Sequence, residues 1–418
     1  MIGTYIIICD IAGYISGAPI YYRNKAIYLE SQGWDVRIVA SNTGRVYIEG
    51  LERFSIGAFD FLRTDPAILT FKQRSRHVDE LVLALDRNIN SPVVVETGTD
   101  WTAYWGETLA QRLEARHFVF FLDEDNKRAK NRLEFFDYKR RRGELACITK
   151  QTMINLFSGY VDLDLNSAVG FRACCTNSIQ DVEDDFSRGI VQASFNIGSI
   201  GRLDKDFVPG LVEDIGSFAQ NHPDLDIQVV FFGGADSVVE ERVAGNLAKN
   251  NNVKVVISGY MWPFAKSAIE KMDVFASAAG SRILSSSFGI PTVAMDVCGN
   301  GAIGFVGDAE VAENPLYRVS GNENDLHASS YFEKVLHGEF CKKKIEPDLN
   351  AQWDAFCEQY QEQLDSALCC KSSLEYFDIS KLPVSRKGAV KRALNSIIGE
   401  SATNRLIGAL KASIGTRR

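Results

Sequence analysis

The sequence lacks the features that mark several protein classes. It contains no run of eighteen apolar residues, which excludes an ordinary transmembrane helix. Its start, MIGTYIIICDIAGYISG, has no basic segment and no small-residue cleavage site, so we expect a buried first strand and not a signal peptide. No phosphate loop of the form G-x-x-x-x-G-K-[ST] occurs, and the first glycine-containing turn, DIAGYISGAP, departs from the dinucleotide fingerprint G-x-G-x-x-G.

Disulfide and metal patterns are also missing. The nine cysteines are an odd number without C-x-x-C spacing, which predicts free thiols in a reducing compartment. The histidines are scattered and show no ligand spacing; they are His77, His117, His222, His327 and His337. We therefore expect a cytoplasmic protein that uses no metal and no cofactor.

Length and charge limit the possibilities further. A chain of 418 residues is too long for one compact core and suggests two domains. The net charge of −8 is uneven, because residues 381–418 contain nine Lys or Arg and one acidic residue, which leaves −16 on the other 380 residues. An acidic body predicts no nucleic-acid partner, whereas the basic tail suits an anionic surface.

Two series of apolar strands alternate with helical segments. The first contains TYIIICD, WDVRIVAS, SPVVVETG and HFVFFLDED, and the second runs from SFNIGSIGRL to PTVAMD. Near-continuous apolar strands separated by helices indicate parallel sheets covered on both faces. We predict an α/β protein with two Rossmann-like, doubly wound domains, whose strand ends face a cleft between them. The expected limits are 1–190, 191–345, 346–380 (a helix that packs back on the first domain) and 381–418 (a basic tail).

Three turns that follow strands have the composition of an anion site. The first, DIAGYISGAP, offers Gly17 for close backbone approach. The second, IGSIGRLDKDF, offers Arg202 as a planar fork and Lys205 as a point charge, a pair suited to a diphosphate. In the third, Gly280, Ser281 and Arg282 could address phosphate oxygens. Plain structural turns are the alternative, but together the three favour a phosphorylated ligand.

These segments resemble, in order and spacing, the GT-B glycosyltransferases, specifically family 4-like enzymes that build bacterial capsule, exopolysaccharide or lipopolysaccharide. SGAPIYYRNKAIYLESQGWDVRIVAS is similar to their glycine-rich loop, first helix and second strand. IGSIGRLDK is similar to their diphosphate segment, and VVISGYMW to the strand before the nucleobase loop. KMDVFASAAGSRILSSSFGIPTVAMD is similar to the donor-side strand and the G-x-P segment. The resemblance covers residues 4–310.

The resemblance implies roles for individual positions. The diphosphate of a nucleotide-sugar donor would be held by Arg202, Lys205, Gly280 and Ser281. Backbone atoms of Tyr260 and Met261 would lie beside the base, and the Ser285 hydroxyl could bond ribose. The family usually places two glutamates, eight residues apart, around the helix that follows Gly280. Here the second position is Leu284 and three serines follow, so this helix would bind the donor without the usual acids.

Carboxylates for catalysis are therefore expected from the first half. SPVVVETG ends near Glu96, and HFVFFLDED ends with Asp123 and Glu124. Glycosyl transfer needs an activated acceptor hydroxyl, and we expect Asp123 or Glu124 on the acceptor side. Loop acids that cap the next helix are the alternative. A retaining reaction, in which the leaving diphosphate serves as base, is favoured over an inverting one.

Two further groups could meet the acceptor. One or two of the cations in the run Lys139–Arg142 could contact a lipid diphosphate, the alternative being a solvated helix face. Trp101, Tyr104 and Trp105 could stack on sugar rings, although we favour core positions for them.

The C-terminal segments predict helices with different partners. In DLNAQWDAFCEQYQEQLDSAL a single apolar stripe is expected to pack on the body. The tail has apolar residues at helical spacing from Val390 to Ile398 and again from Leu406 to Ile414. Basic residues lie largely off these stripes, which suits an anionic membrane surface contacted by 388–418. The acidic body or a partner protein are the alternatives.

These observations favour a glycosyltransferase that uses a nucleotide-sugar donor and a saccharide acceptor, expected to be lipid-linked, at the inner face of the plasma membrane. The missing glutamates keep open a GT-B subunit without activity that supports a partner glycosyltransferase. A GT-B sugar-nucleotide epimerase is the third hypothesis.

Overall fold

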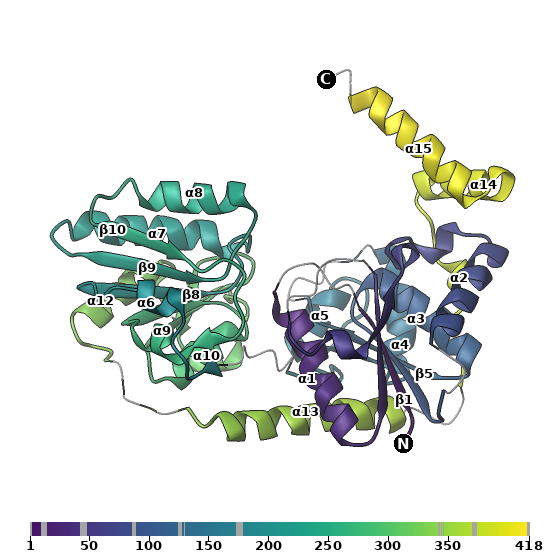
Figure 1. Ribbon diagram of the computed structural model, residues 1–418, viewed down its shortest axis with the longest axis horizontal. Coiled ribbons are helices and arrows are strands. Elements are labelled where there is room, and N and C mark those ends of the chain that lie inside the picture. Colours follow the sequence, from purple (N-terminus) through teal and green to yellow (C-terminus); the bar gives the residue numbers. More distant parts are fainter. Residues whose placement is uncertain are drawn as a thin grey trace. The chain divides into compact units, whose positions relative to one another are not determined.

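The computed structural model forms two compact units, unit 1 and unit 2 (Figure 1). Unit 1 comprises Met1–Gly13, Tyr22–Arg172 and Cys357–Arg418, and unit 2 comprises Tyr14–Tyr21 and Ala173–Phe356. The residues that the structure describes are 2–9, 15–41, 48–85, 89–123, 128, 130–172, 179–341, 343, 345, 347–369 and 374–415, with side chains as far as residue 407.

Unit 1 is built on a six-stranded parallel sheet with strand order β3-β2-β1-β4-β5-β6. The strands are β1 (Thr4–Cys9), β2 (Asp35–Ala40), β3 (Ser55–Ala58), β4 (Val93–Thr97), β5 (Arg116–Phe121) and β6 (Leu145–Cys147). Its helices are α1 (Gly17–Ser31, which belongs to unit 1 from Tyr22 onward), α2 (Phe71–Ala84), α3 (Asp100–Leu113), α4 (Leu133–Arg141) and α5 (Lys150–Phe157).

Both faces of this sheet are covered, which explains the continuous apolar strands. In β1 every side chain is buried, and successive side chains point to opposite faces. Ile6 and Ile8 pack with residues of α2 and α3, whereas Tyr5 points to the face where α1 lies and contacts Lys25. Short 3₁₀ turns connect these elements, among them η3 (Pro66–Ile68), and η5 (Ile379–Lys381) lies in the C-terminal segment.

Unit 2 repeats the pattern with a sheet of order β10-β9-β8-β12-β13-β14. All neighbours are parallel except β14, which is antiparallel to β13. The strands are β8 (Phe195–Ile200), β9 (Ile227–Phe232), β10 (Val253–Ile257), β12 (Val274–Ser277), β13 (Thr292–Met295) and β14 (Ala302–Phe305). The helices are α6 (Asp185–Gly189), α7 (Phe207–Asn221), α8 (Ser237–Leu247), α9 (Lys266–Glu270), α10 (Ser281–Ser287), α11 (Ala309–Glu313) and α12 (Ala328–Leu336).

The start of unit 2 differs from the boundary expected at residue 190. The short strand β7 (Ile179–Gln180) pairs with β11 (Phe264–Ala265), which ties the segment before residue 190 to unit 2. The Lys271 ammonium also donates to the carbonyls of Ser187 (2.7 Å) and Ile190 (3.1 Å). These partners lie 84 and 81 positions away along the chain, so local sequence does not reveal them.

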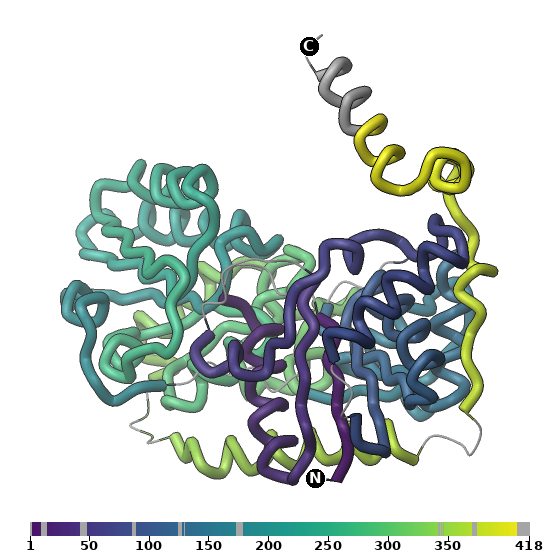
Figure 2. Tube along the Cα trace, turned by 45° about the vertical axis from the view of Figure 1, so that its right-hand side comes forward, coloured from purple at the N-terminus to yellow at the C-terminus, as the bar shows by residue number. Residues whose placement is uncertain are grey.

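The C-terminal segment belongs to unit 1 from residue 357. Helix α13 (Leu349–Cys369) lies beside α1 in both views (Figures 1 and 2), and Tyr28 of α1 donates to the Gln361 side chain at 2.6 Å. Tyr360 and Leu364 of the predicted stripe are buried. The last two helices are α14 (Arg386–Ile398) and α15 (Glu400–Gly415). Within the described residues, no helix has the length and apolar character needed to cross a bilayer.

Candidate functional site

The turn between β8 and α7 presents the predicted diphosphate residues of unit 2. Gly201 has φ of 141°, a conformation that favours glycine, and its N–H donates to the Phe232 carbonyl at 3.1 Å. Leu203 is buried and fixes the middle of the turn to the core. Arg202 is partly exposed, and its Nε donates to Asp204 Oδ1 at 2.8 Å. The turn thus holds a guanidinium and the Lys205 ammonium three residues apart at the carboxyl edge of the sheet.

A second turn, between β12 and α10, lies directly beside the first. β12 pairs with β8, and the Ile200 N–H donates to the Ser277 hydroxyl at 3.0 Å, which joins the two strand ends. Ala279 has φ of 51°, which is uncommon for a residue other than glycine, so the turn is tightly bent before Gly280. Of the predicted residues here, Ser281 begins α10 and is partly exposed.

Arg282 stabilises this turn from within. Its side chain is largely buried, and Nη1 donates to the Ala279 carbonyl at 2.8 Å. A guanidinium held in this way donates a hydrogen bond to a backbone carbonyl of the bent turn. In this structure Arg282 fixes the backbone that precedes α10, and its contact with a phosphate stays a prediction.

Ser285, predicted to bond ribose, lies in the interior of unit 2. Its side chain is fully buried, and its hydroxyl accepts from Thr292 Oγ1 at 3.0 Å and donates to the Arg282 carbonyl at 3.2 Å. The helical period places it one turn after Ser281, on the side that faces β13. This burial corrects the prediction that the Ser285 hydroxyl is presented to a ligand.

The predicted nucleobase residues follow β10. Gly259 has φ of 66° and reverses the chain after the strand. Tyr260 is exposed, whereas Met261 packs against the core on the side of α9 and α10. The backbone between them lies at the carboxyl edge of the sheet, where a base contacted through main-chain atoms could bind.

Gly17 is the first residue of α1. The Ile20 N–H already bonds to the Ser16 carbonyl (3.4 Å), so the first turn of the helix forms at this point. The N–H groups at such a helix start have no intrahelical acceptor. The loop ahead of it, with Gly13, lies outside the described residues.

Asp123 lies at the carboxyl edge of the unit 1 sheet, just after β5. Its side chain is half exposed, and Arg128 donates to it from Nη2 at 3.0 Å. The same guanidinium bonds to Asp100 at the start of α3 at 2.5 Å. Burial raises the pKa of Asp100, against the opposing effect of Arg128. Asp123 is thus an accessible, positioned carboxylate, while Glu124 lies outside the described residues.

Glu96 is placed differently from its prediction. Although it stands near the end of β4, its side chain points to the face under α1 and is 1% exposed. It forms an ion pair with Lys25 and accepts a hydrogen bond from the Tyr5 hydroxyl, and Lys25 also donates to the Gln363 amide oxygen at 2.7 Å. This burial corrects the prediction of an accessible carboxylate at Glu96, because α1 and α13 cover it.

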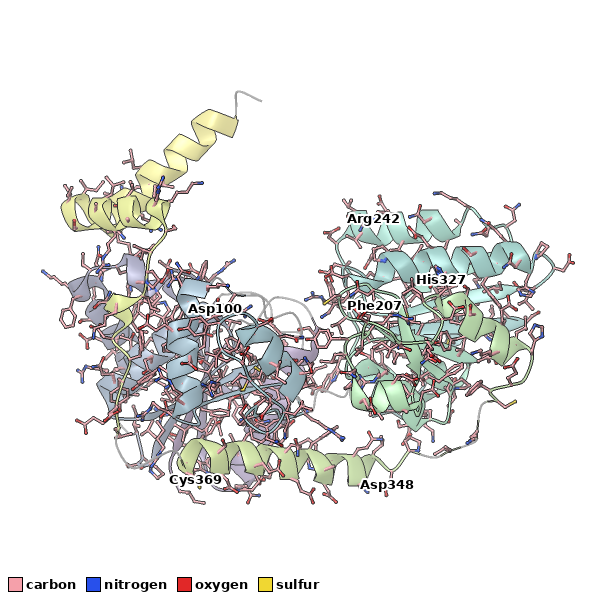
Figure 3. The ribbon with its side chains drawn as sticks, turned by 180° about the vertical axis from the view of Figure 1, so that it is seen from behind. Asp100, Phe207, Arg242, His327, Asp348 and Cys369 are labelled. Atoms are coloured by element: carbon pink, nitrogen blue, oxygen red, sulfur yellow. The ribbon has the colours of Figure 1, made fainter. Side chains whose placement is uncertain are left out.

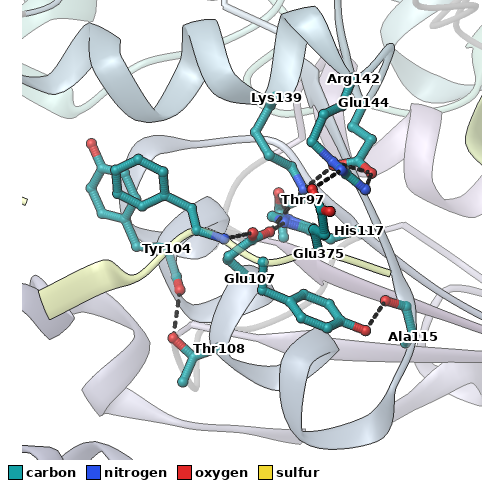
Figure 4. A network of polar contacts seen from close by, with 12 residues as sticks. Thr97, Tyr104, Glu107, Thr108, Ala115, His117, Lys139, Arg142, Glu144 and Glu375 are labelled. Atoms are coloured by element: carbon teal, nitrogen blue, oxygen red, sulfur yellow. Dashed lines mark hydrogen bonds and ion pairs between the residues drawn. The ribbon is translucent and has the colours of Figure 1, made fainter. Parts of the chain in front are cut away.

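In the basic run Lys139–Arg142, the lysine lies in the interior of unit 1 and the arginines lie at or near its surface. Lys139 is buried and donates to Glu107 (2.8 Å) and to Glu144 (2.6 Å), as Figure 4 shows. Arg140 is paired with Asp137, and Arg142 with Glu144 and Glu375. The interpretation of this run as an acceptor contact is therefore corrected for Lys139. Its helix turns that side chain toward α3.

Lys139 belongs to a buried polar network at the centre of Figure 4. His117 Nδ1 lies 2.7 Å from Glu107 Oε2, and Thr97 Oγ1 lies 3.0 Å from His117 Nε2. Burial by itself raises the pKa of Glu107, but Lys139 and His117 outweigh it and bring the pKa to about 2. Burial and the nearby Lys139 lower the pKa of His117. The network therefore consists of an ionised glutamate and a neutral imidazole.

The three aromatic side chains of α3 do not share one environment. Tyr104 and Trp105 are core residues, as favoured from the sequence, and Trp105 Nε1 donates to the Thr64 carbonyl at 2.9 Å. Trp101 is about half exposed, at 48%, in the first turn that also holds Asp100. Only Trp101 of these three could meet a ligand in this structure.

A cavity of about 700 Å³ opens in unit 2 between the start of α7 and two loops. It is lined by residues such as Phe207, Glu213, Asn300, Arg318, Asn322 and His327. Of the predicted site residues that the structure describes, none lines it. His327 Nδ1 lies 2.8 Å from the buried Asp214, and this hydrogen bond and charge raise the pKa of His327. No sequence pattern points to this pair, because 113 positions separate its members.

Metal-binding geometry is not found in the described part of the chain. Within it, no three His, Cys, Asp or Glu side chains are grouped so that they could hold a metal ion.

Comparisons with known proteins agree on the architecture. No protein-family model and no curated protein matches the sequence. A solved glycosyltransferase from Rickettsia africae is 15% identical, covers 86% of this chain and 99% of its own, and has a TM-score of 0.56. HepE of Anabaena, solved with UDP and glucose, is 13% identical with the same coverage and TM-score. A protein from Listeria monocytogenes described as a candidate UDP-N-acetylglucosamine 2-epimerase is 13% identical, covers 90% and 100%, and has a TM-score of 0.50.

At these identities the likeness concerns the fold. Two units with parallel, doubly wound sheets match that architecture along nearly the whole of each solved chain. The prediction of an α/β, two-domain fold is confirmed: the chain has the GT-B fold.

Proposed function

We propose that this protein is a glycosyltransferase that moves a sugar from a nucleotide-sugar donor to a saccharide acceptor. The observation that carries the proposal is the pair of adjacent turns in unit 2, joined by the bond from Ile200 to Ser277. One turn holds Arg202 and Lys205, and the other bends tightly into α10. Cations at a diphosphate stabilise the charge that develops as the sugar leaves. The solved complex of HepE, which has this fold, holds UDP and glucose.

In the proposed reaction the acceptor side is provided by unit 1. Asp123 is the accessible carboxylate there, oriented by Arg128, and Trp101 lies on the helix that begins with Asp100. We assign Asp123 to the acceptor hydroxyl. The reaction proposed is retaining, with the leaving diphosphate as base, and uses no metal. The α10 segment SRILSSS contains no carboxylate, which removes one candidate nucleophile or base from the donor side.

The proposed acceptor is lipid-linked and the proposed pathway is the synthesis of a bacterial surface polysaccharide at the inner face of the plasma membrane. The support is the resemblance in sequence and the basic tail 388–418, which suits anionic lipid. The rest of the chain has a net negative charge, so we expect the tail alone to contact anionic lipid.

Two other functions have a specific observation in their favour. The absence of a carboxylate from α10 favours a GT-B subunit that binds nucleotide and supports a partner transferase. The likeness to the Listeria protein favours a sugar-nucleotide epimerase. Product analysis separates the three: a transferase releases sugar slowly from its donor to water, an epimerase isomerises it, and a binding subunit leaves it intact.

The deciding experiment is a calorimetric titration of the full chain with UDP, GDP and CDP, repeated on Arg202→Ala. We expect one nucleotide to bind and its affinity to fall about tenfold or more in the variant, because a charge-assisted hydrogen bond is lost. The matched control is Arg242→Ala, which removes an exposed arginine from α8 of the same unit and should bind as the parent does. Binding of no nucleotide, or equal loss in both variants, would contradict the proposed donor site.

A further inference from the structure

Helix α14 contacts the body of unit 1 through its polar face. The Asn395 side chain is buried, and its Nδ2 donates to the Ile68 carbonyl of η3 at 3.2 Å. Gln73 of α2 in turn donates to the Asn395 carbonyl at 3.3 Å. Seven residues earlier on the same face, Gly388 packs so closely that an added Cβ would lie 3.2 Å from Ile68 Cγ2. The inward face of α14 therefore runs through positions 388 and 395.

The apolar stripe of α14 consequently points outward. Val390 and Ile397 lie about 200° around the helix from Gly388 and Asn395, respectively. Their side chains are 61% and 76% exposed, and Ile398 at the helix end is exposed as well. An amphipathic helix normally turns such a stripe to the core. Here the exposed members, Val390, Ile397 and Ile398, do not pack on unit 1.

The next helix keeps this arrangement in place. Glu400, at the start of α15, bonds to His77 of α2 at 2.8 Å and lies 3.5 Å from Arg76. Thr403 is buried one turn later, and Leu406 is exposed. The turn between the helices is thus held to α2 at its polar side, while apolar side chains on both helices remain at the surface.

Cations border the exposed apolar residues of α14, and they indicate an anionic partner. Arg386 and Lys387 are exposed at the start of α14, Lys391 is partly exposed on its flank, and Arg405 is exposed on α15. Helix α14 contains no acidic residue, and the one acid of the tail, Glu400, is paired with His77. Exposed apolar side chains bordered by cations are complementary to the surface of an anionic bilayer.

We propose that the outward face of α14, formed by Val390, Ile397 and Ile398 with the flanking cations, docks unit 1 on an anionic lipid bilayer. The helix would lie in the plane of the interface with its apolar stripe among the lipids. Because Asn395 and Glu400 fix the helix to η3 and α2, the whole of unit 1 is oriented by this contact.

Docking through α14 would turn one edge of unit 1 toward the bilayer, and this bears on the class of acceptor that unit 1 meets. η3 follows β3 at the carboxyl edge of the sheet, and Figure 3 shows Asp100, at that edge, on the side of unit 1 occupied by α14. Cys369, at the end of α13, lies on the opposite side (Figure 3). Asp123 and Arg128 are therefore on the membrane side, which fits an acceptor carried on a lipid. This last step rests on the proposed function, whereas the docking itself does not.

The test is co-sedimentation of the full chain with vesicles of phosphatidylglycerol and phosphatidylcholine in equal amounts. We expect Ile397→Asp and Val390→Asp each to weaken binding about tenfold or more, because each removes an apolar side chain from the interface. The matched control is Leu83→Asp on α2, whose parent residue is also 76% exposed but follows the acidic pair Asp79 and Glu80. It should bind as the parent does, and added salt should weaken binding of both.

Three outcomes would overturn the proposal: equal binding to pure phosphatidylcholine, equal loss in Leu83→Asp, or unchanged binding in both α14 variants. A parent dimer that Ile397→Asp makes monomeric, with no vesicle binding by either, would assign the face to a second copy instead. The UDP, GDP and CDP titration of Ile397→Asp separates the two proposals. Nucleotide binding by Ile397→Asp together with its loss of vesicle binding supports the docking face. A parent chain that binds vesicles through this face but binds none of the three nucleotides leaves docking standing while the proposed function fails.

Discussion

At the residue scale, the buried ion pair of Lys25 and Glu96 shows how a polar strand residue can have a structural role. Glu96 has two donors, Lys25 and Tyr5, and Lys25 reaches Gln363 of α13. Burial, followed by the charge of Glu96, raises the pKa of the Tyr5 hydroxyl. A carboxylate covered and bonded in this way is unavailable to an acceptor.

We therefore expect Glu96→Ala to act on stability. Removing one partner of a buried pair leaves Lys25 uncompensated, which costs on the order of 3–5 kcal/mol of the free energy of unfolding. Urea denaturation followed by circular dichroism measures this cost. The double variant Lys25→Met with Glu96→Leu should recover much of the loss, since no charge then stays buried.

Asp123→Asn is the contrasting substitution. Asp123 is half exposed, so the free energy of unfolding should change by no more than about 0.5 kcal/mol while turnover falls. A large loss of stability in Asp123→Asn, or none in Glu96→Ala, would contradict the assignment of roles.

Sequence could not separate Glu96 from Asp123, since Glu96 lies at the carboxyl end of one apolar strand and Asp123 just after the end of another. The difference lies in what covers each strand end. Lys25 and Gln363 are 71 and 267 positions from Glu96, and such contacts leave no local pattern. Ser285 is similar, because a serine that bonds Thr292 internally is indistinguishable in sequence from one that bonds ribose.

At the scale of elements, the strands were the most predictable part. TYIIIC, FVFF and IQVVFF are buried on both faces, and continuous apolar runs of this length are typical of strands in a covered parallel sheet. The stripe of α14 was also predicted from its spacing, but its direction was not. That direction depends on Asn395 meeting the Ile68 carbonyl, a contact between segments 327 positions apart.

The network of Figure 4 fastens the segment between α13 and α14 to the sheet. The Phe377 N–H donates to Glu107 Oε1 at 2.6 Å, and the Tyr376 hydroxyl donates to the Ala115 carbonyl at 3.1 Å. Burial and the charge of Glu107 raise the pKa of Tyr376 to about 12, so that hydroxyl stays protonated. The segment thus depends on the charge state of Glu107 and His117.

We expect acid to weaken this network in two steps. The pKa of His117 is held below its ordinary 6.5, so an unfolded chain takes up this proton first, and stability falls as the pH drops below about 6.5. Glu107, with a pKa of about 2 against an ordinary 4.5, adds a second loss below about 4.5. Urea midpoints measured between about pH 8 and about pH 2 record both steps.

His117→Asn provides the control for this pH dependence. Without the imidazole, the loss that begins near 6.5 should disappear and the loss that begins near 4.5 should remain. An unchanged profile in the variant would show that other groups produce the first step.

At the scale of the whole molecule, the two units each have their own sheet and core. Separate cores predict two thermal transitions. A nucleotide that binds the turns of unit 2 should stabilise that unit alone. At a hundredfold excess over its Kd, it should raise the free energy of unfolding of unit 2 by about 2.7 kcal/mol and shift that unit's transition to higher temperature. Scanning calorimetry with and without the nucleotide that binds best provides the measurement.

Core variants assign the transitions to the units. Leu364→Ala in α13 should lower the transition temperature of unit 1, and Phe218→Ala in α7 should lower that of unit 2. Each substitution should reduce the free energy of unfolding of its unit by about 2–5 kcal/mol. If nucleotide raised both transitions equally, the donor contacts would not be confined to unit 2.

The reversed orientation of α14 has a consequence for kinetics. A protein held to a bilayer by such a helix meets lipid-borne molecules by lateral diffusion, so the relevant variable is their surface density in the membrane and not their amount per volume of solution. Diluting the acceptor with inert lipid at constant total acceptor would then slow the reaction, and adding more vesicles of the same composition would not hasten it once all protein is bound. Ile397→Asp should abolish this surface-dilution behaviour.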